Sequence, residues 1–349
     1  MHTAKILLRL RKVLISLKDI PTRFQKSVSF MGTLLGHTVP TAMSSDPTEM
    51  TIFSLIGAAV AFVNVPVIVI IFSSQALKKC KELVLIGGLC TVDAFLAMSN
   101  SVSAMDRLLT LPGGTDEQVP QMACFFKYYV LFFFYANLLV GIMTLLVSTE
   151  RFVAVFFPLR YKAHYTRTKG IAMILGCILL CSLLLVGAYI FQISSPNILI
   201  PALCYTTFVY PPLVSIFLVS TRVGATGLGI LLYVPITIRI CQLKVAARKR
   251  VIFVHSTNAS NTPSPFQSVT QQKRNMSFSV TIGLTCLSDL VLLFVPDLIV
   301  NFDLFHLKTY HIIFYRASLL KTVVNLFIYT FRHSELRKEV MMKVFNYHW

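Results

Sequence analysis

Seven stretches of this chain are apolar over the length that a helix needs to cross a lipid bilayer, about 20 residues. They cover residues 51–73, 83–105, 128–149, 170–191, 210–240, 276–300 and 311–331. Because hydrocarbon offers no partner to backbone N–H and C=O groups, such a stretch must be helical. The sequence therefore predicts an all-α fold, a bundle of seven transmembrane helices.

Composition excludes other classes. The chain is 55% hydrophobic and 13% charged, whereas a soluble domain carries about 25% charged residues. The net charge of +18 raises the question of nucleic acid, but most Lys and Arg lie in short segments between the apolar stretches. That placement follows the positive-inside rule of membrane proteins, and we expect no nucleic-acid partner.

The charge of the connections predicts the orientation. The connections after the first, third and fifth stretches are basic, as is the tail after the seventh, and the other connections are not. We expect a multi-pass protein of the plasma membrane with an extracellular N-terminus and a cytosolic C-terminus. Residues 1–48 are expected to be a disordered extracellular tail, 49–332 the seven-helix domain, and 333–349 an amphipathic helix with a short cytosolic tail. The connection 245–274, rich in Ser, Thr, Asn and Pro, is expected to be a mobile loop.

One motif closes the third stretch. Glu150 and Arg151 stand at the membrane boundary, and Pro158 and Leu159 follow. An acid beside an arginine there can form a neutral pair that a cytosolic partner breaks, or the arginine can snorkel to water beside a solvated acid. The run from Glu150 to Tyr161 resembles the Asp/Glu-Arg-Tyr box and following Pro-Leu of rhodopsin-like (class A) G-protein-coupled receptors.

The other stretches carry similar marks at similar spacing. The resemblance implies a switch for activation and G-protein coupling, made by Glu150, Arg151, Tyr233, Asn325 and Tyr329. It implies an intramembrane polar core that includes Asn64 and Asp93, and a short amphipathic eighth helix in the cytosolic tail. The chain departs from that family at Phe294, where Trp is usual two residues before the kink proline, and at Leu326, where Pro is usual.

The resemblance also implies a disulfide between Cys124, at the head of the third stretch, and Cys204, in the second outer loop. Both fall on the oxidising side of the membrane, although two free thiols remain the alternative. Cys124 precedes Arg151 by 27 residues, two more than is usual in the family. The third helix should therefore have an extra half-turn or a bent start.

Ligand-pocket candidates follow from the resemblance. They are Phe133, Asn137, Arg222, Phe294, Asp297 and Arg316. Phe133 stands where amine receptors carry Asp, which argues against an amine ligand. Arg316 stands where prostanoid receptors hold a lipid carboxylate, which favours a carboxylate-bearing lipid or peptide, unless it pairs with a loop acid. Asp297 is expected to face the cavity or to pair internally with Arg222.

Lys321 lies one helical turn before Asn325, on the same face. A lysine at this depth needs a partner, and Asp93 is the nearest expected acid. We predict that Lys321 joins the polar core and replaces the sodium ion that the family often holds there. The alternative is that Lys321 snorkels into a water-filled cavity while Asp93 titrates alone.

The predicted function is that of a receptor that binds an extracellular small-molecule, lipid or peptide ligand and activates heterotrimeric G proteins. We expect membrane lipid as a further partner, and no enzymatic activity, cofactor or metal. The alternative is a seven-span transporter or channel. Such proteins often show internal repeats, and the sequence shows none.

Overall fold

The computed structural model describes residues 47–77, 80–110, 117–193, 198–256, 280–302 and 311–344. Most of the predicted tail 1–48, much of the connection 245–274 and the last five residues lie outside this part of the chain.

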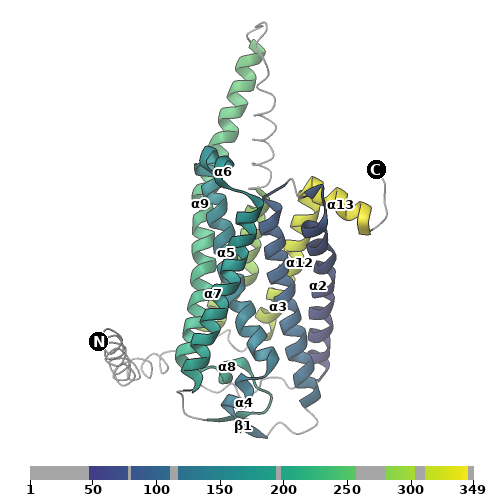
Figure 1. Cartoon of the computed structure of the whole chain (residues 1–349), viewed down its shortest axis with the longest axis vertical. Coiled ribbons are helices and arrows are strands. Elements are labelled where there is room, and N and C mark those ends of the chain that lie inside the picture. The colour runs from purple at the N-terminus through teal and green to yellow at the C-terminus, as the bar shows by residue number, and fades with distance from the viewer. Residues whose placement is uncertain are drawn as a thin grey trace, which may run out of the picture.

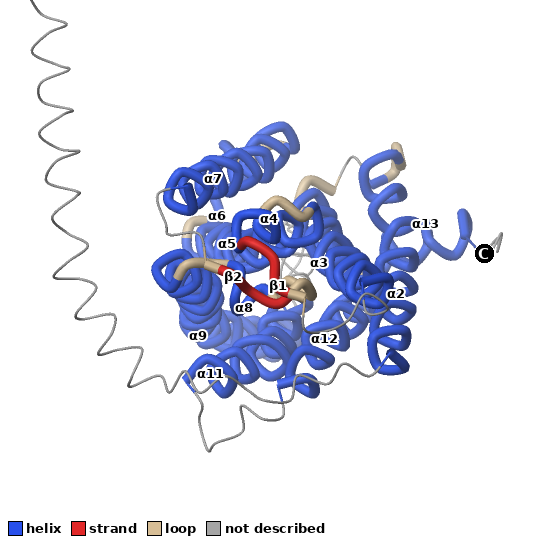
Figure 2. The backbone as a smooth tube through the Cα atoms, turned by 90° about the horizontal axis from the view of Figure 1, so that it is seen from below, coloured by secondary structure: helices blue, strands red, loops and turns tan. Residues whose placement is uncertain are grey.

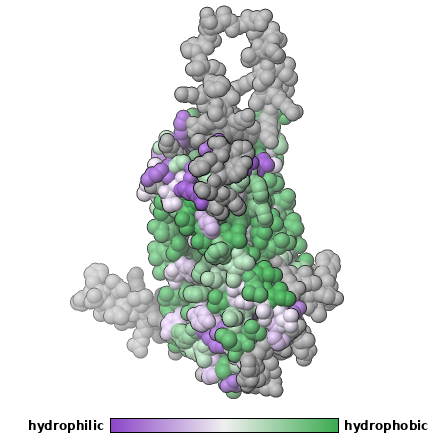
Figure 3. Space-filling view, turned by 90° about the vertical axis from the view of Figure 1, so that its right-hand side faces the viewer, coloured by the Kyte–Doolittle hydropathy of each residue, from purple (hydrophilic) through white to green (hydrophobic). Residues whose placement is uncertain are grey.

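Long helices form a bundle (Figure 1). They are α2 (Pro47–Ser73), α3 (Leu83–Thr110), α5 (Tyr128–Phe156), α7 (Arg167–Ile193), α9 (Pro212–Ser256), the helix 280–302 and α12 (His311–Arg332). Six of the described helices are long and apolar enough to cross a membrane, and α12, which contains Lys321 and Asn325, is a further long helix. Figure 3 shows the apolar side chains as a broad belt, with hydrophilic residues gathered toward the ends. The fold is therefore that of a helical, multi-pass membrane protein.

The fifth long helix differs from its prediction. α9 runs 45 residues and ends at Ser256, so the first part of the connection predicted as a loop is helical and extends beyond the bundle (Figure 1). The loop prediction was wrong for residues 245–256. Residues 246–250 of that segment are Ala, Arg and Lys, which have high helix propensity. The Ser, Thr, Asn and Pro that favoured a loop are concentrated after it.

The sixth long helix changes its winding in the middle. Residues 280–289 are α-helical, η3 (Leu290–Phe294) is a π-helix, and α11 (Val295–Phe302) is α-helical again. Pro296 has no N–H to donate and its ring crowds the preceding turn. A π turn is a common way for a helix to accommodate such a break. This irregular segment lies between two acids, Asp289 and Asp297.

A short helix follows the bundle. α13 (Ser334–Val344) buries Leu336 and Val340, and Ser74 after α2 donates a hydrogen bond of 2.8 Å to Glu339. In Figure 1, α13 leaves the bundle sideways at the same end as α6 (Pro158–His164). The expectation that this helix lies on the cytosolic membrane surface stays a prediction.

The opposite end carries a small cap. Strands β1 (Gln118–Pro120) and β2 (Leu199–Pro201) pair antiparallel, with Val119 opposite Ile200. Two short helices, α4 (Gln121–Phe125) and α8 (Thr206–Val209), complete the cap, and the strands lie across this end of the bundle (Figure 2).

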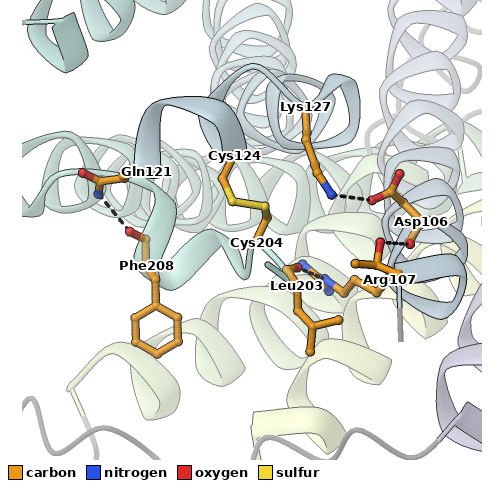
Figure 4. Close-up of a disulfide and its surroundings, with 9 residues drawn as sticks. Asp106, Arg107, Gln121, Cys124, Lys127, Leu203, Cys204 and Phe208 are labelled. Carbon is orange, nitrogen blue, oxygen red and sulfur yellow. Dashed lines mark hydrogen bonds and ion pairs between the residues drawn. A yellow bond between two sulfur atoms is a disulfide. The ribbon is translucent and has the colours of Figure 1, made fainter. Parts of the chain in front are cut away.

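The predicted disulfide is confirmed. Cys124 in α4 and Cys204 are bonded, with their Cα atoms 5.4 Å apart. The helix is interrupted between α4 and α5, so Cys124 lies in a short helix of its own and α5 starts at Tyr128. The bent start inferred from the long spacing to Arg151 is therefore present. Around the bridge, Lys127 pairs with Asp106 at 3.1 Å and Arg107 donates to the carbonyl of Leu203 at 3.3 Å (Figure 4).

We predict that Cys204→Ser sharply lowers surface expression. The bridge closes a loop of 80 residues, and loss of a native disulfide typically costs about 2–5 kcal/mol. Flow cytometry of the epitope-tagged protein measures the effect, with Cys241→Ser, which removes an exposed free thiol, as the matched control. Alkylation of both Cys124 and Cys204 without prior reduction would contradict the prediction.

Candidate functional site

The first cluster lies at the α6 end of the bundle and joins α5 to α6. Arg151 donates to both carboxylate oxygens of Glu150 through Nε and Nη2. The hydroxyl of Tyr161 donates to Glu150 and accepts from Arg151 at 3.0 Å. The Arg151 side chain is only 2% exposed. The arginine is thus paired and buried, not snorkelling.

Tyr161 is fixed in turn by its neighbours. Its ring stacks on Tyr165 with centroids 4.7 Å apart, and Lys81 Nζ lies 5.1 Å from the Tyr161 ring centroid. Lys81 also donates to the Tyr165 carbonyl at 2.7 Å. Burial, above all, raises the pKa of Tyr161, Arg151 opposes the rise and Glu150 adds to it. The phenol is therefore neutral and donates to the acid.

The sequence prediction omitted Tyr161 from the switch. Its position was visible, since it closes the run that begins at Glu150. What could not be seen was that α6 turns back so that a residue eleven positions later reaches the same carboxylate.

The second cluster lies in the middle of the bundle and is almost fully buried. Lys321 Nζ stands 2.7 Å from Asp93 Oδ1 and 3.3 Å from Asp289 Oδ1. The Lys321 and Asp93 side chains are 2% and 3% exposed. Asn325 donates to both carboxylates, at 3.3 Å each. One ammonium and one amide thus hold together two acids from different helices.

The predicted contact between Lys321 and Asp93 is present in the structure, and the snorkelling alternative is not. Asp289 was missed as a partner. An ionisable residue within a span is a functional hypothesis by default, so the signal existed. Its rotation about the helix axis depends on the winding of helix 280–302, which the sequence does not specify.

Three other predicted residues, Asn64, Tyr233 and Tyr329, are also buried. Asn64 donates to the carbonyl of Val60 in its own helix at 2.8 Å, and so is not joined to Asp93. Tyr329 is 1% exposed. Tyr233 packs against Gly283, where an added Cβ would come within 2.8 Å of the ring. Roles of these residues in activation stay predictions.

The third cluster lies between the middle of the bundle and the disulfide end. Arg222 on α9 donates through Nη2 to Asp297 Oδ1 at 2.7 Å and through Nη1 to the side-chain oxygen of Asn137 on α5. Asn137 donates to the carbonyl of Phe133 at 2.7 Å. The Arg222 and Asp297 side chains are 15% and 16% exposed. The internal pair considered for Asp297 is therefore formed.

Two pocket candidates remain, Phe294 and Arg316. Phe294 packs against Gly227, where an added Cβ would lie 3.0 Å from the ring. Arg316 falls in α12, but its side chain lies outside the described residues. Within the described residues, no group of three or more His, Cys, Asp or Glu is placed to hold a metal ion.

The comparisons with known proteins point to a class. Residues 44–208, just under half of the chain, match the family model described as serpentine type 7TM GPCR chemoreceptor Srbc. This stretch is similar to that family and contains Asp93, the Glu150–Arg151 pair and both cysteines of the bridge. Together with the apolar helices and the disulfide, the match supports a membrane receptor of the G-protein-coupled class. It does not single out rhodopsin-like or prostanoid receptors, and no curated protein matches the chain.

We predict that Tyr161→Phe raises basal signalling. The change removes the hydroxyl that bridges Glu150 and Arg151 but keeps the ring. A hydrogen bond to a charged group contributes about 1.5–3 kcal/mol, enough to shift a two-state population about tenfold or more. Basal G-protein activation at matched surface expression measures the shift. Tyr165→Phe is the control, because its buried hydroxyl has no acceptor or donor among the described residues. Equal basal activity in the two variants would refute the bridge.

We predict that Lys321→Met damages folding or activity and that adding Asp93→Asn recovers part of the loss. Leaving one partner of a buried pair alone typically costs about 3–5 kcal/mol. Recovery should be incomplete because Asp289 also contacts Lys321, and Asp289→Asn in the same chain should extend it. Thermal unfolding of the purified receptor measures each step.

The same cluster predicts insensitivity to sodium in the native receptor. In Lys321→Ala, two carboxylates lose their cation, so unfolding should become dependent on sodium. Choline chloride at equal ionic strength is the control. Sodium-specific stabilisation of the native receptor would show that Lys321 does not occupy a sodium position.

Proposed function

We propose that this protein is a plasma-membrane receptor that binds an extracellular chemical ligand between its helices and activates heterotrimeric G proteins. The observation that carries the proposal is the buried cluster of Glu150, Arg151 and Tyr161 at one end of the bundle, in a stretch similar to chemoreceptors of this class. The disulfide cap at the other end supports an extracellular face there, because disulfides persist on the oxidising side.

The mechanism requires two states in equilibrium. In the described state, Glu150 neutralises the charge of Arg151, and the hydroxyl of Tyr161 helps to hold it in place. An agonist that favours a second state shifts the population without any chemical step. In that state helix 280–302 swings about the irregular segment near Pro296, and Arg151 is freed toward a cytosolic partner. Neither a cofactor nor catalysis is needed.

Two features of the chain bear on the chemistry of the ligand. The similarity to chemoreceptors supports a small exogenous molecule, and the cation at Arg316, by resemblance to prostanoid receptors, supports a carboxylate-bearing lipid or peptide. Lys321 and its two acids are paired and buried in the middle of the bundle, and this supports a receptor more than a channel, whose polar residues would line a water-filled path.

We expect Arg151→Ala to abolish G-protein activation while surface expression persists, because the residue is proposed to reach the G protein once Glu150 releases it. Constitutive activation across a panel of chimeric G proteins measures the loss and needs no known agonist. Lys127→Ala, which breaks an outer ion pair of the kind that contributes little, is the control. Normal activation by Arg151→Ala would remove the basis of the receptor proposal.

A further inference from the structure

Two intramembrane ion pairs of this protein differ in how they are enclosed. Lys321 and Asp93 are 2% and 3% exposed, whereas Arg222 and Asp297 are 15% and 16% exposed. Both pairs hold charges at a depth where an ionisable group is costly. Because Arg222 contacts Asn137, a buried residue of the central helix α5, its guanidinium points into the bundle, away from lipid. The Arg222 pair is therefore the less enclosed of the two ion pairs, and its guanidinium lies on the inner side of α9.

The guanidinium of Arg222 is only partly used. The Nε–H and one Nη2 N–H lie along the same edge, which matches the two oxygens of a carboxylate. Arg151 uses this edge fully, with both nitrogens on Glu150. Arg222 donates from Nη2 to a single oxygen of Asp297, and its buried Nε finds no acceptor among the described residues. A buried donor of a charged group left unsatisfied is costly and calls for an explanation.

The backbone presents this edge in one fixed direction. Gly141 lies against Arg222, where an added Cβ would be 3.0 Å from the Arg222 Cα and carbonyl oxygen. α5 and α9 therefore meet without an intervening side chain. One turn earlier, Asn137 accepts from Nη1 while its own amide is anchored on the Phe133 carbonyl. Asn137 thereby holds the Nη1 side of the guanidinium in place. The Nε–Nη2 edge remains able to exchange Asp297 for another acceptor.

We propose that Arg222 recognises the carboxylate of a small organic acid, which displaces Asp297 and forms two hydrogen bonds where Asp297 forms one. The site lies ten residues into α9, about 15 Å from the start of the helix at 1.5 Å per residue, on the side of the bundle that carries the disulfide cap. The inference rests on the proposed receptor function and names its ligand class. It moves the recognition of a carboxylate from Arg316 to Arg222.

Displacement of Asp297 would couple ligand binding to the helix that carries this acid. Asp297 belongs to α11, directly after Pro296 and the π-helix η3. Once the ligand takes the place of Asp297 on Arg222, the ion pair between α9 and α11 is lost, and the segment 295–302 no longer shares this contact with α9. A neutral amide of the same shape cannot do this, because it lacks the charge that competes with Asp297.

The test measures binding of radiolabelled octanoate, with octanamide as the uncharged counterpart, to the purified full-length receptor in vesicles of zwitterionic lipid. The native receptor should bind octanoate and not octanamide. Asp297→Asn removes the competing carboxylate and should tighten binding about tenfold or more. Arg222→Gln should abolish it, and Arg222→Lys should weaken it, since an ammonium lacks the planar edge. Arg239→Gln changes an exposed arginine of the same helix and should leave binding unchanged.

Because Arg222→Gln removes a cation that Asp297 contacts, the double variant Arg222→Gln with Asp297→Asn serves as a second, charge-balanced test and should also lose binding. Unchanged binding in the double variant, or no octanoate binding by either the native receptor or Asp297→Asn, would overturn the inference. No G protein enters this assay. Octanoate binding that depends on Arg222, in a receptor that activates no G protein, would therefore refute the proposed function and leave the carboxylate site standing.

Discussion

The contact of Lys321 with Asp93 and Asp289 joins three helices through buried charges in the middle of the bundle. Between helices in a membrane, apolar side chains gain little over lipid, so packing and polar contacts decide association. Lys321 comes from α12, Asp93 from α3 and Asp289 from the helix 280–302, and Asn325 donates to both acids. Each charge would be costly alone at this depth. The three helices must therefore stay in register for the charges to stay paired, and this constrains the middle of the bundle.

The same rule explains the other two clusters. Arg151 is buried with Glu150 and Tyr161, and Arg222 with Asp297 and Asn137. In each of these clusters one cation joins different helices: Arg151 joins α5 to α6, and Arg222 joins α9 to both α5 and α11. The clusters occur at three depths along the bundle. A change of partner at one depth can reach another only through helices that have two stable arrangements, and helix 280–302, with its π turn and Pro296, has the irregularity that such a helix needs.

The sequence predicted much of this architecture because the hydrophobic signal is strong. Lipid forces each long apolar stretch into a helix, and an isolated lysine such as Lys321 demands an acid. The disulfide followed from compartment and resemblance. The sequence could not predict how each side chain is rotated about its helix axis, or which path the chain takes after a helix ends. Asp289 reaches Lys321 only with the winding that helix 280–302 adopts, Tyr161 reaches Glu150 only because α6 turns back, and α9 continues through residues whose composition alone did not distinguish helix from loop.

Helix 280–302 contributes an acid to both the Lys321 cluster and the Arg222 cluster. Asp289 and Asp297 are eight residues apart, one before the π-helix and one after Pro296. The first holds a cation of α12, and the second holds a cation of α9. A rigid α-helix would fix the angle between two such acids. An irregular segment lets that angle change, at the cost of one ion pair or the other. A change of partner at Arg222 moves Asp297, and Asp297 and Asp289 belong to the same helix. The ion pair of Lys321 with Asp289 in the middle of the bundle can therefore respond to a change at Arg222.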